Sequence, residues 1–447
     1  MGKVLFSGFG RAAVNPPMGI EVSGYYNVRL ADGILDDVEA NAVALRMGEK
    51  TVLLITVDNC SLLRRVTDEC KEEIYRALGV EGDAVYIHST HTHTAPLVDY
   101  SDNPLSLEYR EILKSGIVKA CREAIEDLAP SKMGYAIGNA PNIAFVRRFR
   151  MKDGTIRTNP GVNNPDILHP IGEVDERVNV LRFTREGRAD IVIANFGNHP
   201  DTVGGTKISG DWPAFTRRIF EKAIDNTSCI FFNGAEGDIN HVNVNPRGGD
   251  LNDMFMDFDD VSRGYGHARH MGRVVAGAIM QVYDKVAYTD VDSIDFIQRE
   301  IEIPSNKPTV EELPLAHKYY DLHKAGKDDE IPYEGMMLTT VVAEAVRMVE
   351  LENGPEAFLL HFSAVKIGKV AFFGIPGEPF MEIGRKIKEL PGWDMVLPTC
   401  NTNGDDGYFP TTDAYNEGGY EARSSNFKSG VAERIVEAAA EILSDFN

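Results

Sequence analysis

Short apolar runs alternate with longer amphipathic stretches along the chain, and this alternation predicts an α/β protein. Ala40 to Met47 and Thr51 to Val57 are apolar runs joined at a tight turn, which is typical of two paired strands. Arg64 to Leu78 repeats its apolar positions at helical spacing and stops at Gly79. The apolar run from Ala84 to Ile87 predicts the next strand, so the elements follow one another in α/β order.

The same two patterns continue to the end of the chain. Helical spacing predicts further helices at 107–128, from 209–213 through Ile219, at 268–282, in two pieces over 309–348, at 381–390 and at 429–443. Apolar runs predict further strands at 178–183, 191–196, 230–233, 286–303, 358–367, 370–374 and 395–398. No change in composition marks a linker, so we predict one α/β domain over residues 1–447, with a large mixed, twisted β-sheet flanked by helices.

Glycines near the N-terminus carry a separate signal. Gly8 and Gly10, and then Gly24 before Tyr25, indicate backbone that turns or packs closely against another element. A G-x-G pair without a strand-to-helix context does not predict a dinucleotide site.

Polar loops follow several of the apolar strands at their carboxyl ends. These loops are residues 90–93, 198–201 and 236–241, and a fourth holds Glu378 between Gly377 and Pro379. In α/β sheets the loops at the carboxyl ends of strands converge on one crevice. The sequence therefore predicts a functional site built from these remote segments.

Histidines and carboxylates in these loops suggest a metal site. His91 and His93 are two positions apart, so on an extended backbone their imidazoles point to one face. The candidate ligands are His91, His199 and Glu378, with His93, His241 and Tyr408 as additional donors. Two histidines and one carboxylate with an open position are typical of catalytic zinc. The alternative is a set of strand ends whose histidines hydrogen-bond to backbone.

Two further segments each leave two interpretations open. Residues 145–150 interleave aromatic residues with three arginines, which fits an edge strand with a charged face or a guanidinium aimed at a substrate oxygen. Residues 245–265 are rich in Asp, Gly and Met, which fits an acidic surface loop or a lid over the crevice.

Charge and composition exclude some partners. The net charge of −22 argues against nucleic acid and against an anionic membrane. No signal peptide or membrane-spanning run is evident, and the five scattered cysteines have no C-x-x-C spacing, which is typical of reduced thiols. We expect a cytoplasmic protein with a small-molecule substrate. The sequence is compatible with a homo-oligomer.

Five motifs occur in the same order as in a known family. They are Gly8-Phe9-Gly10-Arg11 with Gly24-Tyr25, Thr90-His91-Thr92-His93-Thr94-Ala95-Pro96, Asn198-His199-Pro200, Pro376-Gly377-Glu378 with Gly384-Arg385, and Tyr408 with Thr411-Thr412 and Tyr420-Glu421-Ala422. Together they resemble the catalytic domain of the neutral/alkaline ceramidases, which are zinc-dependent amidases. The resemblance is spread over most of the chain.

This resemblance implies roles for individual residues. It implies zinc ligation by His91, His199, Glu378 and Tyr408, with His93 beside the metal. It further implies that Tyr420 faces the substrate carbonyl and that Arg147, or else Arg148, is the active-site arginine.

The chain also departs from the family pattern. The family's G-D-V-S-P-N corresponds to residues 237–242 here, and Asn240 stands in place of the serine. Because an asparagine is not a useful acyl acceptor, a serine acyl-enzyme at this position is excluded, and we expect Asn240 to orient the substrate. We also expect neither a signal peptide nor a C-terminal β-sandwich, so ceramide specificity does not carry over.

These inferences predict a zinc-dependent hydrolase that cleaves an amide bond in a small soluble substrate. His93 is expected as general acid–base, and Tyr420 and Arg147 as donors to the oxyanion. Asp211 or Asp238 is expected to fix the tautomer of a ligand histidine. One alternative is a zinc-dependent esterase, lactonase or hydrolase of a sugar-derived substrate, and another is a non-catalytic protein with structural zinc.

Overall fold

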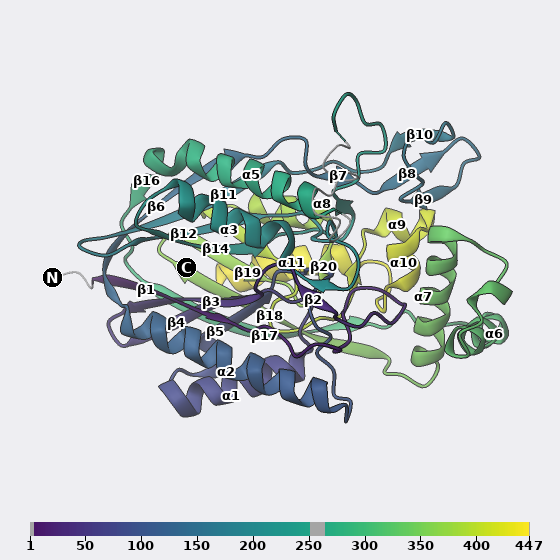
Figure 1. The fold of residues 1–447 in the computed structure, drawn as a ribbon, viewed down its shortest axis with the longest axis horizontal. Coiled ribbons are helices and arrows are strands. Elements are labelled where there is room, and N and C mark those ends of the chain that lie inside the picture. The colour runs from purple at the N-terminus through teal and green to yellow at the C-terminus, as the bar shows by residue number, and fades with distance from the viewer. Residues whose placement is uncertain (1–3, 251–263, 447) are drawn as a thin grey trace.

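The strand pair expected at residues 40–57 lies inside a nine-stranded sheet (Figure 1). The structure is a computed structural model that describes residues 4–250 and 264–446. In spatial order the strands are β14 (Thr227–Asn233), β12 (Asp190–Phe196), β11 (Arg177–Arg185), β6 (Ala129–Asn139), β1 (Leu5–Ala13), β3 (Glu39–Met47), β4 (Lys50–Val57) and β5 (Val85–Ser89), with β16 (Ala287–Thr289) on β6. The β4–β5 and β12–β14 pairs are parallel and the others are antiparallel, so the sheet is mixed as predicted.

A second sheet of four strands packs on the first. Its order is β17 (Ile294–Pro304), β18 (Ala357–Ile367), β19 (Val370–Gly374) and β21 (Met395–Thr399). Leu45, Leu54 and Phe183 of the large sheet share one buried cluster with Phe372 and Leu397 of the smaller sheet. This apolar layer joins the two sheets face to face.

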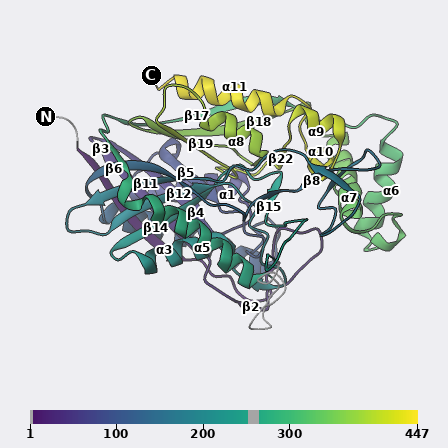
Figure 2. The same cartoon turned by 90° about the horizontal axis from the view of Figure 1, so that it is seen from above.

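Helices cover the two outer faces, which gives four layers (Figure 2). The helices on the large sheet are α1 (Arg64–Leu78), α2 (Pro104–Glu126), α3 (Asp211–Ala223) and α5 (Tyr265–Val282). The helices on the smaller sheet are α8 (Met381–Lys388) and α11 (Val431–Ser444). The predicted fold class, a large mixed sheet flanked by helices, is confirmed.

Several smaller elements complete the fold. The helices are α6 (Leu313–Lys324), α7 (Gly335–Glu352), α9 (Thr412–Glu417) and α10 (Tyr420–Ser424), with short 3-10 turns at Gly82–Ala84, Tyr283–Lys285 and Asp328–Glu330. The strands are β2 (Gly33–Ile34) with β13 (Lys207–Ile208), β7 (Phe145–Val146) with β15 (Ile239–Asn240), β20 (Glu378–Pro379) with β22 (Tyr408–Phe409), and β8 (Arg148–Met151) between β9 (Ile156–Thr158) and β10 (Ile167–Pro170). Among the described residues, none of the helices combines the length and apolarity needed to cross a membrane.

Gly8 and Gly10 explain why α2 lies so close to β1. A Cβ atom on Gly8 would stand 2.1 Å from the carbonyl oxygen of Ala124, and one on Gly10 would stand 2.1 Å from that of Ala120. The close backbone approach expected at these glycines is therefore confirmed. The long strand around them was not expected, because glycine weakens the β pattern in a sequence.

The lid considered for residues 245–265 falls mostly outside the described residues. The described flanks are an irregular stretch up to residue 250 and the start of α5 at Tyr265. The lid interpretation stays a prediction.

Candidate metal centre

The loop after β5 holds His91 in a backbone conformation that few side chains adopt. His91 has φ of +73°, in the left-handed region. Its amide donates to the Asn59 carbonyl at 2.9 Å, and the Thr90 amide donates to the Val57 carbonyl at 2.9 Å. The Asn233 side chain donates to the Thr90 carbonyl at 3.2 Å. A left-handed backbone conformation costs a residue other than glycine about 1–3 kcal/mol, and these bonds hold His91 in it. Residues in such strained conformations often cluster at functional sites.

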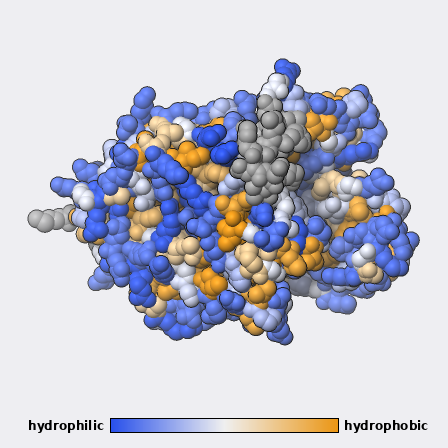
Figure 3. Space-filling model, viewed as in Figure 1, coloured by the Kyte–Doolittle hydropathy of each residue, from blue (hydrophilic) through white to orange (hydrophobic). Residues whose placement is uncertain are grey.

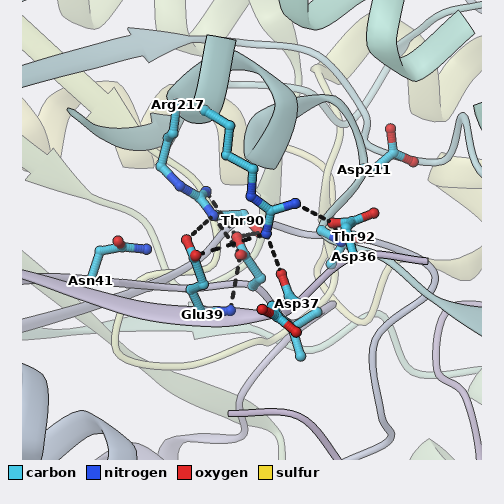
Figure 4. A network of polar contacts seen from close by, with 12 residues as sticks. Asp36, Asp37, Glu39, Asn41, Thr90, Thr92, Asp211 and Arg217 are labelled. Atoms are coloured by element: carbon cyan, nitrogen blue, oxygen red, sulfur yellow. Dashed lines mark hydrogen bonds and ion pairs between the residues drawn. The ribbon is translucent and has the colours of Figure 1, made fainter. Parts of the chain in front are cut away.

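A buried charge network lies behind this loop (Figure 4). The Arg217 guanidinium reaches Asp58 at 2.6 Å and Glu39 at 3.1 Å, and Arg217 and Asp58 are both fully buried. Thr90 donates its hydroxyl to the Asp58 carboxylate at 3.3 Å. The network therefore links α3, β3 and the end of β4 to the residue that precedes His91.

His93 and His199 reach the same place from two other positions. The His93 amide donates to the Pro200 carbonyl at 3.1 Å, which ties the loop after β5 to the loop after β12. The Nε2 atom of His91 lies 3.2 Å from that of His199 and 3.2 Å from that of His93. The Nε2 atoms of His93 and His199 are 3.0 Å apart. Three imidazoles thus turn one nitrogen each toward a common point.

Glu378 and Tyr408 approach this point from the smaller sheet. They are register partners in the parallel pair β20–β22, and the Glu378 amide donates to the Gly407 carbonyl at 2.8 Å. Glu378 Oε2 lies 3.5 Å from His91 Nε2. Among the described residues this buried oxygen has no hydrogen-bond partner.

These donors fit a divalent metal ion. Zinc–nitrogen bonds near 2.0–2.1 Å place tetrahedral ligands about 3.3 Å apart, close to the observed spacing of the imidazole nitrogens. Burial lowers the pKa of His93 and of His199, so both imidazoles are neutral and keep a lone pair on Nε2. The unpartnered Glu378 oxygen offers a further donor; burial raises the pKa of this carboxyl to about 8, so a bound cation would displace its proton. Ligand type favours zinc among common metals.

A further histidine, His88, lies in the strand that leads into this loop and has a different role. His88, in β5, donates from Nδ1 to the Cys400 carbonyl at 2.7 Å and accepts from the Asn233 amide at 2.9 Å on Nε2. Burial lowers its pKa to about 3, so the ring stays neutral. His88 is a backbone-bonded strand histidine, which is the alternative that the sequence left open for this stretch.

Three residues at the centre were not named as candidates in the sequence analysis, although Glu236 lies in the predicted loop 236–241. The Cys60 carbonyl lies 2.9 Å from His91 Nδ1, and the Asn401 amide lies 2.9 Å from the same nitrogen. Glu236 is fully buried with one oxygen 3.9 Å from His91 Nδ1. His91, His199, Glu236 and Glu378 form one group with donor atoms near enough to hold an ion. Glu236 faces the outer nitrogen of His91, so it lies behind a ligand. The one available signal was a carboxylate flanked by glycine and alanine at a strand end.

The two adjacent arginines point in different directions. Arg147 lies over the Tyr408 ring at 5.4 Å, pairs with the buried Glu421 at 2.8 Å and donates to the Gly237 carbonyl at 2.6 Å. Arg148 turns away to Glu417, at 3.4 Å. The structure thus places Arg147, and not Arg148, beside the centre.

Tyr420 lines a cavity beside Tyr408, and Asn240 lies behind its wall, bonded to the lining residue Asn159. The Tyr420 ring packs against Tyr408 at 5.6 Å. The side chain of Asn240 donates to Asn159 at 2.8 Å and accepts from the Val242 amide at 2.9 Å. The cavity has a volume of about 640 Å³, and its lining includes Thr158, Asn159, Met336, Met337, Thr340 and Tyr420. It is therefore of the size that small-molecule sites have.

Three other candidates lie away from the centre. Asp211 accepts from the amides of Thr202 and Val203 at 2.9 Å, and Asp238 accepts from the Met381 amide at 2.7 Å, so the structure brings neither carboxylate to a ligand histidine. His241 packs against His267, at 5.8 Å between ring centroids, in a separate pocket.

Comparison with known proteins identifies the fold. No protein-family model and no curated sequence matches the chain. The crystal structure of neutral ceramidase from Pseudomonas aeruginosa superposes with a TM-score of 0.73 at 18% identity, covering 99% of this chain and 75% of that chain. The chain has the neutral ceramidase fold. A ceramidase complexed with C2 gives a TM-score of 0.73 at 16% identity, covering 99% of this chain and 76% of that chain. The expected likeness is thus confirmed for the fold, including its mixed sheets and flanking helices.

Proposed function

We propose that the protein is a zinc-dependent hydrolase that cleaves an amide bond in a small substrate. The observation that carries this proposal is the meeting of three imidazoles and one unpartnered carboxylate oxygen, with His91 Nε2 3.5 Å from Glu378 Oε2, in a neutral ceramidase fold. A bound zinc would polarise the scissile carbonyl and lower the pKa of a water molecule to about 7.

The chain's own residues supply donors for the oxyanion. The Arg147 guanidinium is held on one side by Glu421 at 2.8 Å and lies over Tyr408 on another, so its charge is fixed in place before substrate arrives. The Tyr420 hydroxyl lies 3.4 Å from that of Tyr26 at the edge of the cavity. Both donors are fixed by neighbours, and preorganised donors of this kind stabilise developing negative charge.

The cavity supports a small substrate of mixed polarity. Met336 and Met337 line it together with Thr158 and Asn159. Asn240 has both side-chain ends occupied, by Asn159 and by the Val242 amide, so it stiffens the cavity wall. The face seen in Figure 3 carries apolar residues in small separate patches among hydrophilic ones, which favours a substrate delivered from water.

Hydrolysis assays on purified, zinc-loaded protein test this proposal. Short-chain N-acyl amides, simple esters and lactones would be compared for wild type, Glu378→Gln and the matched control Glu382→Gln, whose side chain is 57% exposed on α8. We expect amide cleavage by wild type and by Glu382→Gln, and none by Glu378→Gln. Preferred cleavage of esters or lactones would assign the enzyme to the esterases or lactonases instead of the amidases. Activity in Glu378→Gln would contradict the proposal.

A further inference from the structure

We propose that Tyr26 is a positioning residue that orients the hydroxyl group of Tyr420. The inference rests on the proposed function, in which Tyr420 donates a hydrogen bond to the oxyanion. It assigns a role to a residue from the N-terminal part of the chain for which the sequence analysis predicted none. That role is to turn one O–H bond toward the substrate before the reaction begins.

Tyr26 and Tyr420 meet through their hydroxyl groups. The two oxygen atoms are 3.4 Å apart, and either group can donate. This distance exceeds the usual spacing of about 2.7–2.8 Å between hydroxyl oxygens. Hydrogen bonds of catalytic groups are often long before the substrate binds and shorten in the complex. Among the described residues, Tyr26 is the hydrogen-bond partner of the Tyr420 hydroxyl.

The rest of the Tyr420 side chain is already held in place. Its ring packs against the Tyr408 ring at 5.6 Å between centroids, and its backbone amide donates to the Thr158 hydroxyl at 3.4 Å. Rotation of the O–H bond is the freedom that remains, because a hydroxyl proton turns to suit its partners. When Tyr26 donates to the Tyr420 oxygen, the Tyr420 proton is left to point at the substrate. Accepting a hydrogen bond also makes a hydroxyl a stronger donor.

Tyr26 is itself held from two sides. Its ring meets the His323 ring of α6 edge to face, with the centroids 6.4 Å apart. The neighbouring Tyr25 donates its hydroxyl to the Asp201 carboxylate, and the Arg29 guanidinium lies over the Tyr25 ring at 4.1 Å. These contacts place the Tyr26 hydroxyl before any substrate arrives.

The segment 24–26 also lies against the candidate metal centre. A Cβ atom on Gly24 would stand 2.6 Å from His93 Nδ1, so only glycine lets this backbone, with φ of +100°, lie against the imidazole. The Tyr25 ring lies 5.6 Å from the His93 ring. The segment therefore connects the metal centre with Tyr420, and Tyr26 stands where a group that acts on the reacting carbonyl through Tyr420 is needed.

Kinetics of the full-length, zinc-loaded protein test the inference with a double-variant cycle. Tyr26→Phe keeps the ring beside His323 and removes only the hydroxyl. For the short-chain N-acyl amide that wild type cleaves, we expect kcat to fall about 2–10-fold with KM unchanged, as for loss of one hydrogen bond. Tyr420→Phe should lower kcat about 10²-fold or more, and the double variant should be no slower than Tyr420→Phe alone. Tyr75→Phe, at a residue 52% exposed on α1, is the control and should match wild type.

A measurement without substrate separates the inference from the proposed function. In protein labelled with carbon-13 at the tyrosine Cζ atoms, the Tyr420 resonance is identified by its absence in Tyr420→Phe. We expect this resonance to move in Tyr26→Phe and to stay in place in Tyr75→Phe, with thermal unfolding showing that each variant is folded. An unmoved resonance, or a kcat loss in Tyr26→Phe that recurs in full in the Tyr420→Phe background, would overturn the inference. A moved resonance in a wild-type protein that hydrolyses no substrate would contradict the proposed function and not the contact between the two hydroxyls.

Discussion

Glu378 and Tyr408 lie opposite each other as register partners in the short parallel pair of β20 and β22. The Glu378 amide is bonded to the Gly407 carbonyl at 2.8 Å, so backbone bonds set the position of the carboxylate before any ion arrives. His91 and His199 come to the same place from the ends of β5 and β12. The centre is therefore built by backbone pairing between elements that are remote in sequence.

Metal content tests whether these remote segments form one site. We expect about one zinc per chain in purified wild type, as a single four-ligand site requires, and its loss in both His91→Ala and Glu378→Ala. Elemental analysis after gel filtration measures it, with His361→Ala as a control outside the centre. A wild-type protein that is folded yet takes up no metal would contradict the scheme.

The buried pair of Arg217 and Asp58 predicts a large effect on stability. Arg217→Met leaves the Asp58 carboxylate buried without its cation, and breaking such a pair costs about 3–5 kcal/mol of unfolding free energy. Arg76→Ala removes an exposed pair with Glu73 and should cost at most about 1 kcal/mol. Urea denaturation of the two variants provides the comparison. Equal losses of unfolding free energy in the two variants would contradict a larger contribution from the buried pair than from the exposed pair.

Matched substitutions distinguish the two adjacent arginines. Arg147→Lys keeps the charge but not the planar fork that reaches Glu421 and the Gly237 carbonyl together. We expect kcat to fall about 10²-fold or more, as for loss of an oxyanion donor, with metal content unchanged. Arg148→Lys should keep kcat, because Arg148 contacts Glu417 instead. Steady-state kinetics of both variants distinguishes the two arginines. A loss of kcat in Arg148→Lys but not in Arg147→Lys would identify Arg148 as the active-site arginine.

Asp211 predicts a pH dependence of stability. Burial raises its pKa from 3.8 to about 7, so between these values the folded protein holds a proton that the unfolded chain releases. The stabilising contribution is complete below pH 3.8 and is lost as pH rises through about 7. Relative to Asp211→Asn, the unfolding free energy of wild type should fall by up to about 1.4 kcal/mol per pH unit in this window.

Asp175 gives the opposite sign and serves as the control for this measurement. Although burial opposes the shift, Arg177 and Lys388 lower its pKa from 3.8 to about 2. Its contribution is therefore present above pH 3.8 and is lost as pH falls toward 2. Unfolding titrations that run parallel for wild type and Asp211→Asn from pH 4 to 7 would contradict the assignment to Asp211.

Local chemistry determined the elements and the residue types of the centre. Periodicity placed α1 at Arg64–Leu78 and the strands β3 and β4 within one residue of their observed bounds, since apolar spacing follows directly from one buried face. Gly8 and Gly10 in β1 predicted a close backbone approach, but the sequence pattern did not predict the strand that contains them. Histidines and a carboxylate at strand ends marked the loops that meet.

Only the tertiary structure decided how those residues divide their work. Which nitrogen of an imidazole faces inward depends on what lies against the other one, and the Cys60 carbonyl, which lies 2.9 Å from His91 Nδ1, comes from a segment that no local pattern connects to that histidine. In the same way, the choice between Arg147 and Arg148 depends on Glu421 and Glu417, and the buried position of Glu236 depends on the loop after β14 packing against Pro379. Sequence patterns report burial and local geometry, whereas the partner across the space between loops is set by the packing of the two sheets.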